Sequence, residues 1–300
     1  MTNYEYPKID RKDLALDFAI RDAKILSGTT EYGYKIEERV PYYNYMSKNT
    51  WEKFLQDMSP LHQAQFRDAD GGELDEYKKR GKTVPPKMAS YGSSSRFLYG
   101  LSERIPGFHF EKLLPTRVGG TANLDGYLIR NNQDIFIEAK CREIYSANKN
   151  KISSVYFKLY KYIAGKTRTT RKFEYDEKLN IFTIDGKVVK HCDIKQLICH
   201  FLAICANILE NGANRNVKFI YLIFNPNKNT DFTKCEKVKK YKEEILKDYN
   251  DAITYNDLNW LFDIIMDYQA EHLKINKPSD YRFEFELMDQ DRYKEMFICQ

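Results

Sequence analysis

The sequence contains no apolar run long enough to cross a membrane. A transmembrane helix needs roughly 20 consecutive apolar residues, and no window of this chain approaches that length. The first residues, 1–8, also lack the basic and apolar regions of a signal peptide. We therefore expect a soluble, cytoplasmic protein with no membrane partner.

Cysteine and histidine are too few and too scattered for a metal site built from thiolates and imidazoles. The 300 residues include six Cys and five His, with no CxxC pair and no zinc-finger spacing. Cys192, Cys199 and Cys205 are spaced like residues on the buried side of a helix. We expect these three to be reduced thiols in the core.

Acidic residues are missing from 144–173, a basic segment that also contains several tyrosines. Cations can neutralise phosphates there, and tyrosines can stack on unpaired bases. The segment therefore predicts a nucleic-acid-binding surface, and the alternative is a solvated face with ordinary tyrosine packing. The basic residues predicted to bind nucleic acid are Lys149, Lys151, Lys158, Lys161, Arg168 and Arg171.

The chain does contain enough apolar material for a folded core, with 42% hydrophobic and 14% aromatic residues. A chain of this length can bury one large core or two modest ones. The pattern divides it into a mainly helical region with a Gly/Pro-rich linker at 1–90, a core region at 91–230, and a helical C-terminal extension at 231–300.

Periodicity and turn residues predict the order of elements in the core region. Apolar residues at helical spacing fill 193–211, and the almost continuously apolar segment 217–224 predicts a strand buried on both faces. A strand, a helix and a strand in succession imply a right-handed crossover and a mixed sheet. Further helices are predicted at 11–26, 48–58, 96–105, 234–247 and 257–273, strands at 108–114 and 281–288, an inserted hairpin at 173–189 and a loop region at 69–95.

The segment 122–141 predicts a β-hairpin with charged residues on one face. Two apolar runs flank Asn131-Asn132, and Asn tolerates the positive φ that a two-residue turn requires. If the residues flanking this pair close the turn, Asp125 lies directly opposite Glu138, and Lys140 shares their face.

Two facing carboxylates repel each other, so this register predicts a compensating cation. A hard divalent ion takes carboxylate and carbonyl oxygens as ligands. Asp125, Glu138 and the carbonyl of Ala139 therefore form a candidate site for Mg²⁺, with Mn²⁺ as a substitute.

This constellation resembles the active site of the PD-(D/E)xK nuclease superfamily, in which Asp, Glu and Lys lie on adjacent strands. Asp125 matches the first acid, Glu138 the second and Lys140 the lysine, while Leu124 stands where the motif has proline. The strict resemblance covers only about 30 residues, and the motif is short. Other acid–x–lysine triplets occur in the chain, but only this one ends a purely apolar run with a second acid in register.

The resemblance implies an α/β fold, with a restriction-endonuclease-like αβββαβ core built on a mixed sheet. It also implies that Gln196 points toward the site, in a Gln-xxx-Tyr pattern in which His200 replaces the tyrosine. By itself, His200 is predicted to be a satisfied, partly buried histidine.

A Gly-Gly-Glu-Leu loop at 71–74, followed by a serine-rich helix start, is similar to a group of predicted bacterial nucleases in the same superfamily. Members of the superfamily often add a further Glu near the metal. Glu73, Glu103 and Glu111 are candidates here. The residue patterns alone favour a turn residue for Glu73 and surface positions for the other two.

The predicted function is metal-dependent hydrolysis of phosphodiester bonds, as in a DNA endonuclease of restriction or defence type. Cutting both strands often requires two sites, hence a homodimer. The alternatives are an RNA-directed nuclease, a catalytically silent nucleic-acid-binding module, and an unrelated α/β metalloenzyme. The predicted catalytic residues are Asp125, Glu138, Lys140 and Gln196.

Overall fold

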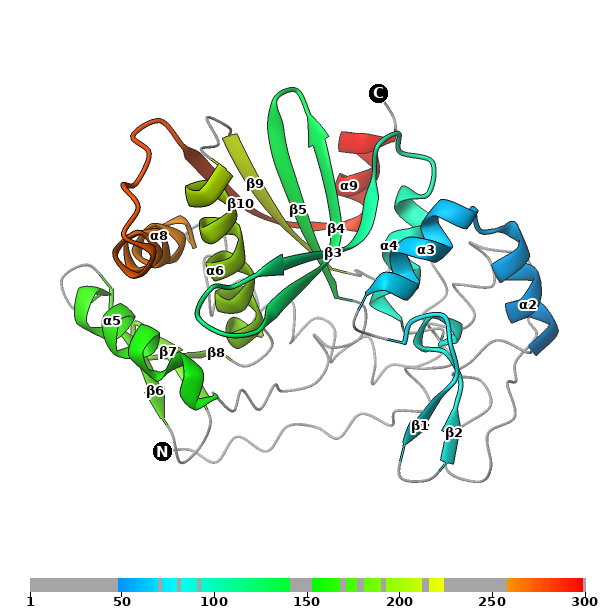
Figure 1. Cartoon of the computed structure of the whole chain (residues 1–300), viewed down its shortest axis with the longest axis horizontal. Helices are drawn as coiled ribbons and strands as arrows, with labels where there is room; N and C mark the ends of the chain where they lie inside the picture. The colour runs from blue at the N-terminus through cyan, green and yellow to red at the C-terminus, as the bar shows by residue number, and fades with distance from the viewer. Residues whose placement is uncertain are drawn as a thin grey trace.

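A five-stranded mixed sheet organises the part of the chain that the computed structural model describes (Figure 1). That part comprises residues 48–69, 72–79, 82–90, 93–140, 153–167, 171–176, 181–189, 193–211, 216–223 and 258–298. The strand order is β10-β9-β5-β4-β3. The predicted α/β class with a mixed sheet is confirmed.

Three strands form an antiparallel meander, and two more lie parallel to its last strand. The meander consists of β3 (His109–Pro115), β4 (Thr121–Arg130) and β5 (Gln133–Lys140). The parallel strands are β9 (Asn216–Ile223) and β10 (Arg282–Asp289). Every residue of β9 after Asn216 is buried, which explains its apolar run.

The turn between β4 and β5 adopts the predicted two-residue geometry. Asn131 and Asn132 have φ of 51° and 58°, the left-handed conformation that a type I′ turn requires at both positions. Arg130 then faces Gln133, and the register continues to Gly126 opposite Ile137. The predicted hairpin and its register are confirmed.

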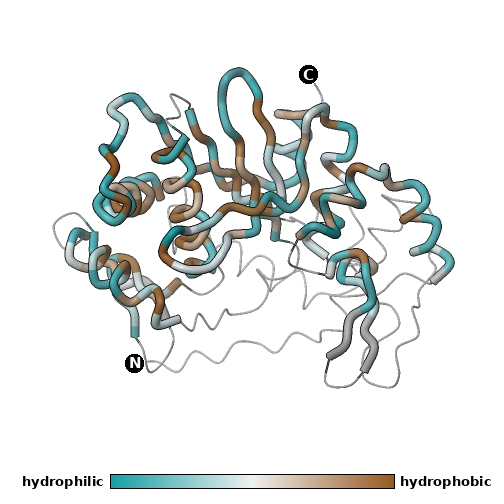
Figure 2. The backbone as a smooth tube through the Cα atoms, viewed as in Figure 1, coloured by the Kyte–Doolittle hydropathy of each residue, from teal (hydrophilic) through white to brown (hydrophobic). Residues whose placement is uncertain are grey.

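Helices cover both faces of the sheet (Figure 1). On one face, α6 (Ile194–Asn211), α8 (Asn259–Leu273) and α5 (Phe157–Thr167) bury their apolar sides. Figure 2 shows apolar residues gathered on the central strands and on the packed sides of these helices. The sheet is therefore buried between two helical layers.

The opposite face carries α2 (Lys48–Asp57), α3 (Pro60–Asp68), α4 (Ser94–Ser102) and α9 (Gln290–Phe297). Serine side chains cap two of these helices: Ser59 accepts from His62 N, and Ser93 accepts from Arg96 N. Short 3₁₀ turns occur at η2 (Lys87–Ala89) and η4 (Ser154–Tyr156).

Three predictions about smaller elements need correction. The region 69–95, predicted as a loop, contains a two-stranded sheet of β1 (Tyr77–Lys79) and β2 (Lys82–Val84). The inserted hairpin has three strands, β6 (Phe173–Asp176), β7 (Ile181–Ile184) and β8 (Lys187–Val189). In the C-terminal extension, the strand predicted at 281–288 is confirmed as β10, which joins the central sheet, so the description of 231–300 as helical needs correction. Parallel pairing with β9 satisfies its backbone, which local sequence patterns cannot reveal.

Two predicted helices, at 11–26 and 234–247, lie outside the described residues. None of the helices in the described ranges is long and apolar enough to span a membrane.

We predict that Gly126→Ala lowers the free energy of unfolding by about 1–3 kcal/mol, the usual cost of overpacking a core. An added methyl group at Gly126 would come within 2.5 Å of Phe108 Cζ and 3.0 Å of Leu98 Cδ2. Urea unfolding measures the change. Gly165→Ala is the control, because a methyl group there meets no atom within 4 Å and Ala favours helix. An unchanged unfolding midpoint in Gly126→Ala would contradict close packing at this strand.

Candidate active site

The β4–β5 register places the first two predicted acids side by side. The β4–β5 pairing runs to Gly126 opposite Ile137; Asp125 and Glu138 are the next residues on the two strands, and their carboxylates repel each other. The backbone N–H of Ala139 donates to Asp125 Oδ2 at 2.7 Å, which fixes the Asp125 side chain beside the end of β5. The predicted juxtaposition of these two carboxylates is confirmed.

Glu111 adds a third carboxylate beside Asp125 and Glu138. These three residues, on the adjacent strands β3, β4 and β5, form the acidic row. The β3–β4 pairs Phe110–Gly126 and Lys112–Leu124 leave Glu111 opposite Asp125. Glu111 has φ of 54° inside the strand, a conformation that costs of order 1–3 kcal/mol for a residue with a side chain and that clusters at functional sites.

The carboxylate of Glu111 is held by a neighbour on β4. Glu111 is only 4% exposed, and Asn123 Nδ2 donates to its Oε2 at 2.6 Å. The surface position favoured for Glu111 was therefore wrong, because the β3–β4 hairpin brings it into the row. The same register argument used for Asp125 and Glu138, extended one strand back, could have found it.

Helix α6 contacts both charged residues at the end of β5. Lys140 Nζ donates to Glu138 Oε1 at 2.5 Å and to Gln196 Oε1 at 2.6 Å. His200, one turn further along α6, places Nε2 at 2.9 Å from Glu138 Oε2. The predicted orientation of Gln196 toward Lys140 is observed. The prediction that His200 is only partly buried was wrong, since it is 2% exposed and contacts Glu138.

Burial and crowding shift the carboxylate pKa values in opposite directions. Burial, with repulsion from Glu138, raises the pKa of Asp125 well above its ordinary range. Burial and neighbouring carboxylates raise the pKa of Glu111 to about 8. Burial would also raise the pKa of Glu138, but attraction to Lys140 and His200 lowers it to about 2. The raised pKa values favour neutral forms of Asp125 and Glu111 near neutral pH, so Glu138, which pairs with Lys140, carries the negative charge of the row.

The donor set has the chemistry that a hard divalent cation requires. Glu111 Oε1 and Asn123 Oδ1 are buried oxygens without a hydrogen bond, and a cation would satisfy such atoms. Within the described ranges, however, no group of three or more His, Cys, Asp or Glu side chains is gathered as a metal site. Glu111 and Asp125 instead each direct one oxygen to a donor of the chain, and Glu138 directs both of its oxygens, to Lys140 and His200.

The two remaining candidate acids, Glu73 and Glu103, lie in different surroundings. Glu73 is 7% exposed, pairs with Lys87 at 3.1 Å and helps to raise the pKa of Glu111. It therefore belongs at the edge of the row, although the sequence favoured a simple turn residue. Glu103 is exposed and pairs with Arg104, as the sequence suggested.

The structure describes only part of the basic segment 144–173. Lys158 and Lys161 are exposed on α5, and Arg171 lies 3.6 Å from Asp185. Tyr160 is 7% exposed within the core, so it is not placed to stack on a base. Lys149, Lys151 and Arg168 lie outside the described residues.

The cysteine prediction is tested at two positions. Cys205 is buried and Cys199 partly buried, and both are free thiols. Cys192 lies outside the described residues.

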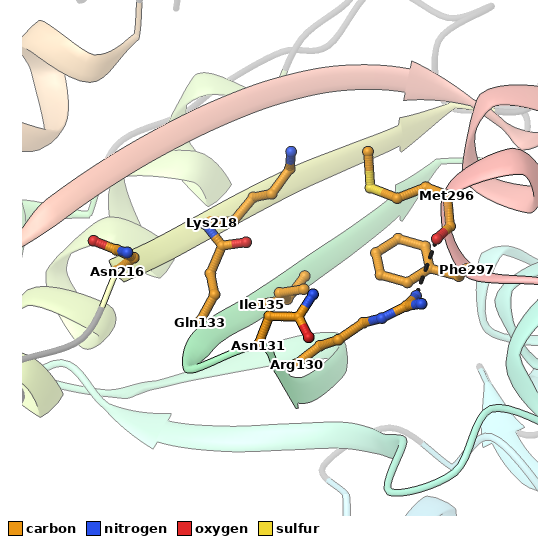
Figure 3. A pocket seen from close by; sticks show the side chains of 8 residues that line it. All are labelled: Arg130, Asn131, Gln133, Ile135, Asn216, Lys218, Met296 and Phe297. Carbon is orange, nitrogen blue, oxygen red and sulfur yellow. Dashed lines mark hydrogen bonds between the residues drawn. The ribbon is translucent and has the colours of Figure 1, made fainter. Parts of the chain in front are cut away.

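A cavity of about 250 Å³ lies at the other end of β5 (Figure 3). Arg130 and Lys218 reach it, but Arg130 donates to Met296 O and Lys218 pairs with Glu284 at 3.0 Å. It opens at the turn of the β4–β5 hairpin, about 20 Å along β5 from Lys140 at 3.3 Å per residue. We therefore treat it as separate from the acidic row.

Comparison with known proteins identifies no relative: no protein-family model, curated protein or solved structure matches this chain.

We predict that Glu111 makes stability fall as pH rises in the absence of divalent ions. In the unfolded chain its carboxyl ionises near its ordinary pKa of 4.5, whereas the folded pKa is about 8. Between these values only the unfolded chain releases the proton. The free energy of unfolding therefore falls by about 1.4 kcal/mol per pH unit from this group.

Glu111→Gln should flatten this slope, measured by urea unfolding from pH 5 to 7.5 in EDTA. The exposed-site control Glu103→Gln should retain it. An equal slope in Glu111→Gln and the unmodified chain would show that Glu111 is not a buried neutral acid.

Proposed function

We propose that this chain is a metal-dependent nuclease of the PD-(D/E)xK type that hydrolyses phosphodiester bonds, with DNA as its substrate. One observation carries the proposal: three carboxylates on adjacent strands, Glu111, Asp125 and Glu138, lie close enough to repel one another, with Lys140 beside the last. The elements α4, β3, β4, β5, α6 and β9 follow the αβββαβ order that the resemblance implies, with η4, α5 and the sheet β6–β8 inserted between β5 and α6, and this order supports the proposal.

Asp125, Glu138 and the Ala139 carbonyl would hold Mg²⁺ or Mn²⁺, with Glu111 as a further carboxylate. When bound, such an ion lowers the pKa of a coordinated water and stabilises charge developing on phosphate. The buried oxygen Oε1 of Glu111, which lacks a hydrogen bond, supports this role.

The residues of the chain supply position and charge. Lys140 would orient the attacking water and stabilise negative charge in the transition state. Gln196 holds the Lys140 amine at 2.6 Å, which limits the rotamers of a flexible side chain. His200 is a positioning residue, because its contact with Glu138 at 2.9 Å restricts the carboxylate from the helix side.

The second candidate is a module with the same fold that binds nucleic acid without cutting it. It is favoured by the absence of a gathered group of metal ligands in the described ranges and by the direct Lys140–Glu138 ion pair. An ion pair in this position can stabilise the fold without catalysis.

We predict cleavage that requires Mg²⁺ or Mn²⁺ and that falls by about 100-fold or more in Lys140→Ala, because the positive charge beside the reacting phosphate is removed. The assay offers single- and double-stranded DNA and RNA, with and without EDTA. Lys53→Ala, which removes an exposed lysine on α2, is the control and should keep the wild-type rate. Full activity in Lys140→Ala would refute the nuclease assignment. Binding that survives Asp125→Ala, with no cleavage of any substrate, would support the silent module.

We also predict that His200→Ala raises the metal concentration for half-maximal cleavage by about 10-fold or more, as expected for a group that orients a ligand. His200→Gln should restore part of the affinity, because its amide can still donate to Glu138. His272→Ala, at an exposed position on α8, should change nothing. Calorimetry of Mn²⁺ binding provides a readout independent of turnover, and wild-type affinity in His200→Ala would contradict the positioning role.

A further inference from the structure

The start of helix α5 presents an aromatic side chain to solvent. Phe157, the first residue of α5, is 41% exposed, and Val155, two residues before it, is 52% exposed. Among the side chains that the structure describes, every other Phe, Tyr or Trp is buried or half-buried. A single exposed apolar side chain carries little information by itself, so the meaning of Phe157 depends on its neighbours.

Lysines flank the exposed ring. Lys158 follows Phe157 directly, and Lys161, four residues after Phe157, shares its side of the helix. Both lysines are exposed, and neither forms an ion pair within the described ranges. Residues 144–173 contain no Asp or Glu. These three residues, which we call the α5 platform, therefore combine an aromatic ring with two positive charges that attract a polyanion.

The opposite side of α5 holds the α5 platform in place. Leu159, Tyr160 and Ile163 are buried in the core that α5 shares with α6 and α8. Just before α5, the hydroxyl of Tyr156 donates to the carbonyl of Gly119 in the β3–β4 turn at 3.3 Å. The ring is therefore carried on an anchored element, which reduces the ordering that a partner must impose on binding.

The same anchor places the α5 platform close to the candidate active site. Tyr156, next to Phe157, holds its hydroxyl 3.7 Å from Cys199 Sγ. Cys199 lies on α6 one turn after Gln196, and its thiol is close enough to Glu138 for the two to interact electrostatically. Figure 1 shows α5 on the same side of the sheet as α6. A substrate in the site can therefore extend onto α5.

An aromatic ring beside two lysines suits a single strand better than a duplex. In a duplex the bases stack on one another, and a side chain reaches the face of a base only after the base is unstacked, which costs free energy. An unpaired base offers its face directly, and stacking on an aromatic side chain tolerates any base. Lysine contacts to phosphate likewise position the strand without reading its sequence.

We propose that the α5 platform binds single-stranded DNA, with an unpaired base stacked on Phe157 and neighbouring phosphates contacted by Lys158 and Lys161. The proposal rests on the proposed nuclease function and names the class of its substrate: single-stranded DNA, or the unpaired end of a duplex. It also changes the stacking residue expected in the basic segment, because Tyr160 is buried whereas Phe157 is exposed.

The test is DNA binding by the full chain carrying Phe157→Ala. Fluorescence anisotropy in EDTA, at about 50 to 200 mM salt, compares a labelled unstructured single strand with a duplex of the same length. We expect the dissociation constant for the single strand to rise about 5-fold or more, with little change for the duplex. The slope of log K against log salt should stay the same, because stacking releases no counterions.

The lysines are tested by Lys158→Gln together with Lys161→Gln. The salt slope for the single strand should become shallower by about 1.4, since each phosphate contact on a single strand contributes about 0.7. The charge-matched control, Lys53→Gln with Lys274→Gln, changes two exposed lysines on other elements and should keep the slope of the unmodified chain.

Two further substitutions separate stacking from general apolar contact. Phe157→Trp should retain affinity, whereas Phe157→Leu, which is apolar but has no aromatic face, should lose affinity as Phe157→Ala does. Leu61→Ala, at a position 65% exposed on α3, is the control for loss of an exposed apolar side chain and should bind like the unmodified chain. Thermal unfolding establishes that each variant folds. If Phe157→Ala does not fold, the comparison of Phe157→Leu with Phe157→Trp takes its place.

The outcomes separate this inference from the proposed function. Cleavage by the unmodified chain, with unchanged single-strand binding by Phe157→Ala, would overturn the α5 platform and leave the nuclease assignment standing. Equal losses for the single strand and the duplex would also overturn it. Single-strand binding that depends on Phe157, without cleavage under any divalent ion, would support the platform and overturn the nuclease assignment. An unmodified chain that neither binds nor cuts DNA would overturn the two together.

Discussion

Repulsion among Glu111, Asp125 and Glu138 is the constraint on which the candidate site depends. Carboxylates at facing positions of adjacent strands are unfavourable, and burial makes their charge more costly. The chain offsets part of this cost with Lys140 and with single hydrogen bonds from Asn123 and the backbone of Ala139. Burial and mutual repulsion favour the neutral forms of Glu111 and Asp125, and a bound cation would favour their ionised forms.

The surrounding structure serves to keep this arrangement in place. The Asn-Asn turn sets the β4–β5 register, and the positive φ of Glu111 changes the path of β3. Beyond that point Leu114 packs on the α6 face of the sheet, whereas Phe110 packs on the other. Helix α6 then presents Gln196 to Lys140 and His200 to Glu138, at the end of β5. A strained backbone of this kind persists only where surrounding packing supports it.

Acidic and basic residues lie on different elements of the structure. Acidic groups gather at the end of β5, whereas basic residues occur on α5 and on the β1–β2 hairpin. A phosphodiester substrate presents negative charge along its length and needs cations along its path and a metal at the scissile bond. Separation of the two signs keeps the basic elements from neutralising the carboxylates.

Local sequence patterns determined the elements with strong periodicity and the β4–β5 register. Helix α6, strand β9 and the placement of Asp125 beside Glu138 follow from side-chain spacing and turn chemistry, which act over a few residues. They did not determine the partners of β10 or the three-stranded form of the inserted sheet. Pairing between strands that are far apart in the sequence depends on which apolar faces the rest of the fold has not yet buried.

The same division applies to the site. Lys140 and Gln196 were predicted from the motif and its resemblance, and the β3–β4 register could have placed Glu111 in the same way. The contacts of Asn123 and His200 with the row come only from the tertiary structure. Glu111 lies on the edge strand β3, and its backbone there has a positive φ that is unusual for a residue with a side chain. His200 is as buried as a histidine of the core, but it faces the carboxylate of Glu138 across the interface between α6 and the sheet. Burial and facing contacts are properties of the packed fold, so the sequence alone could name these residues but not decide their surroundings.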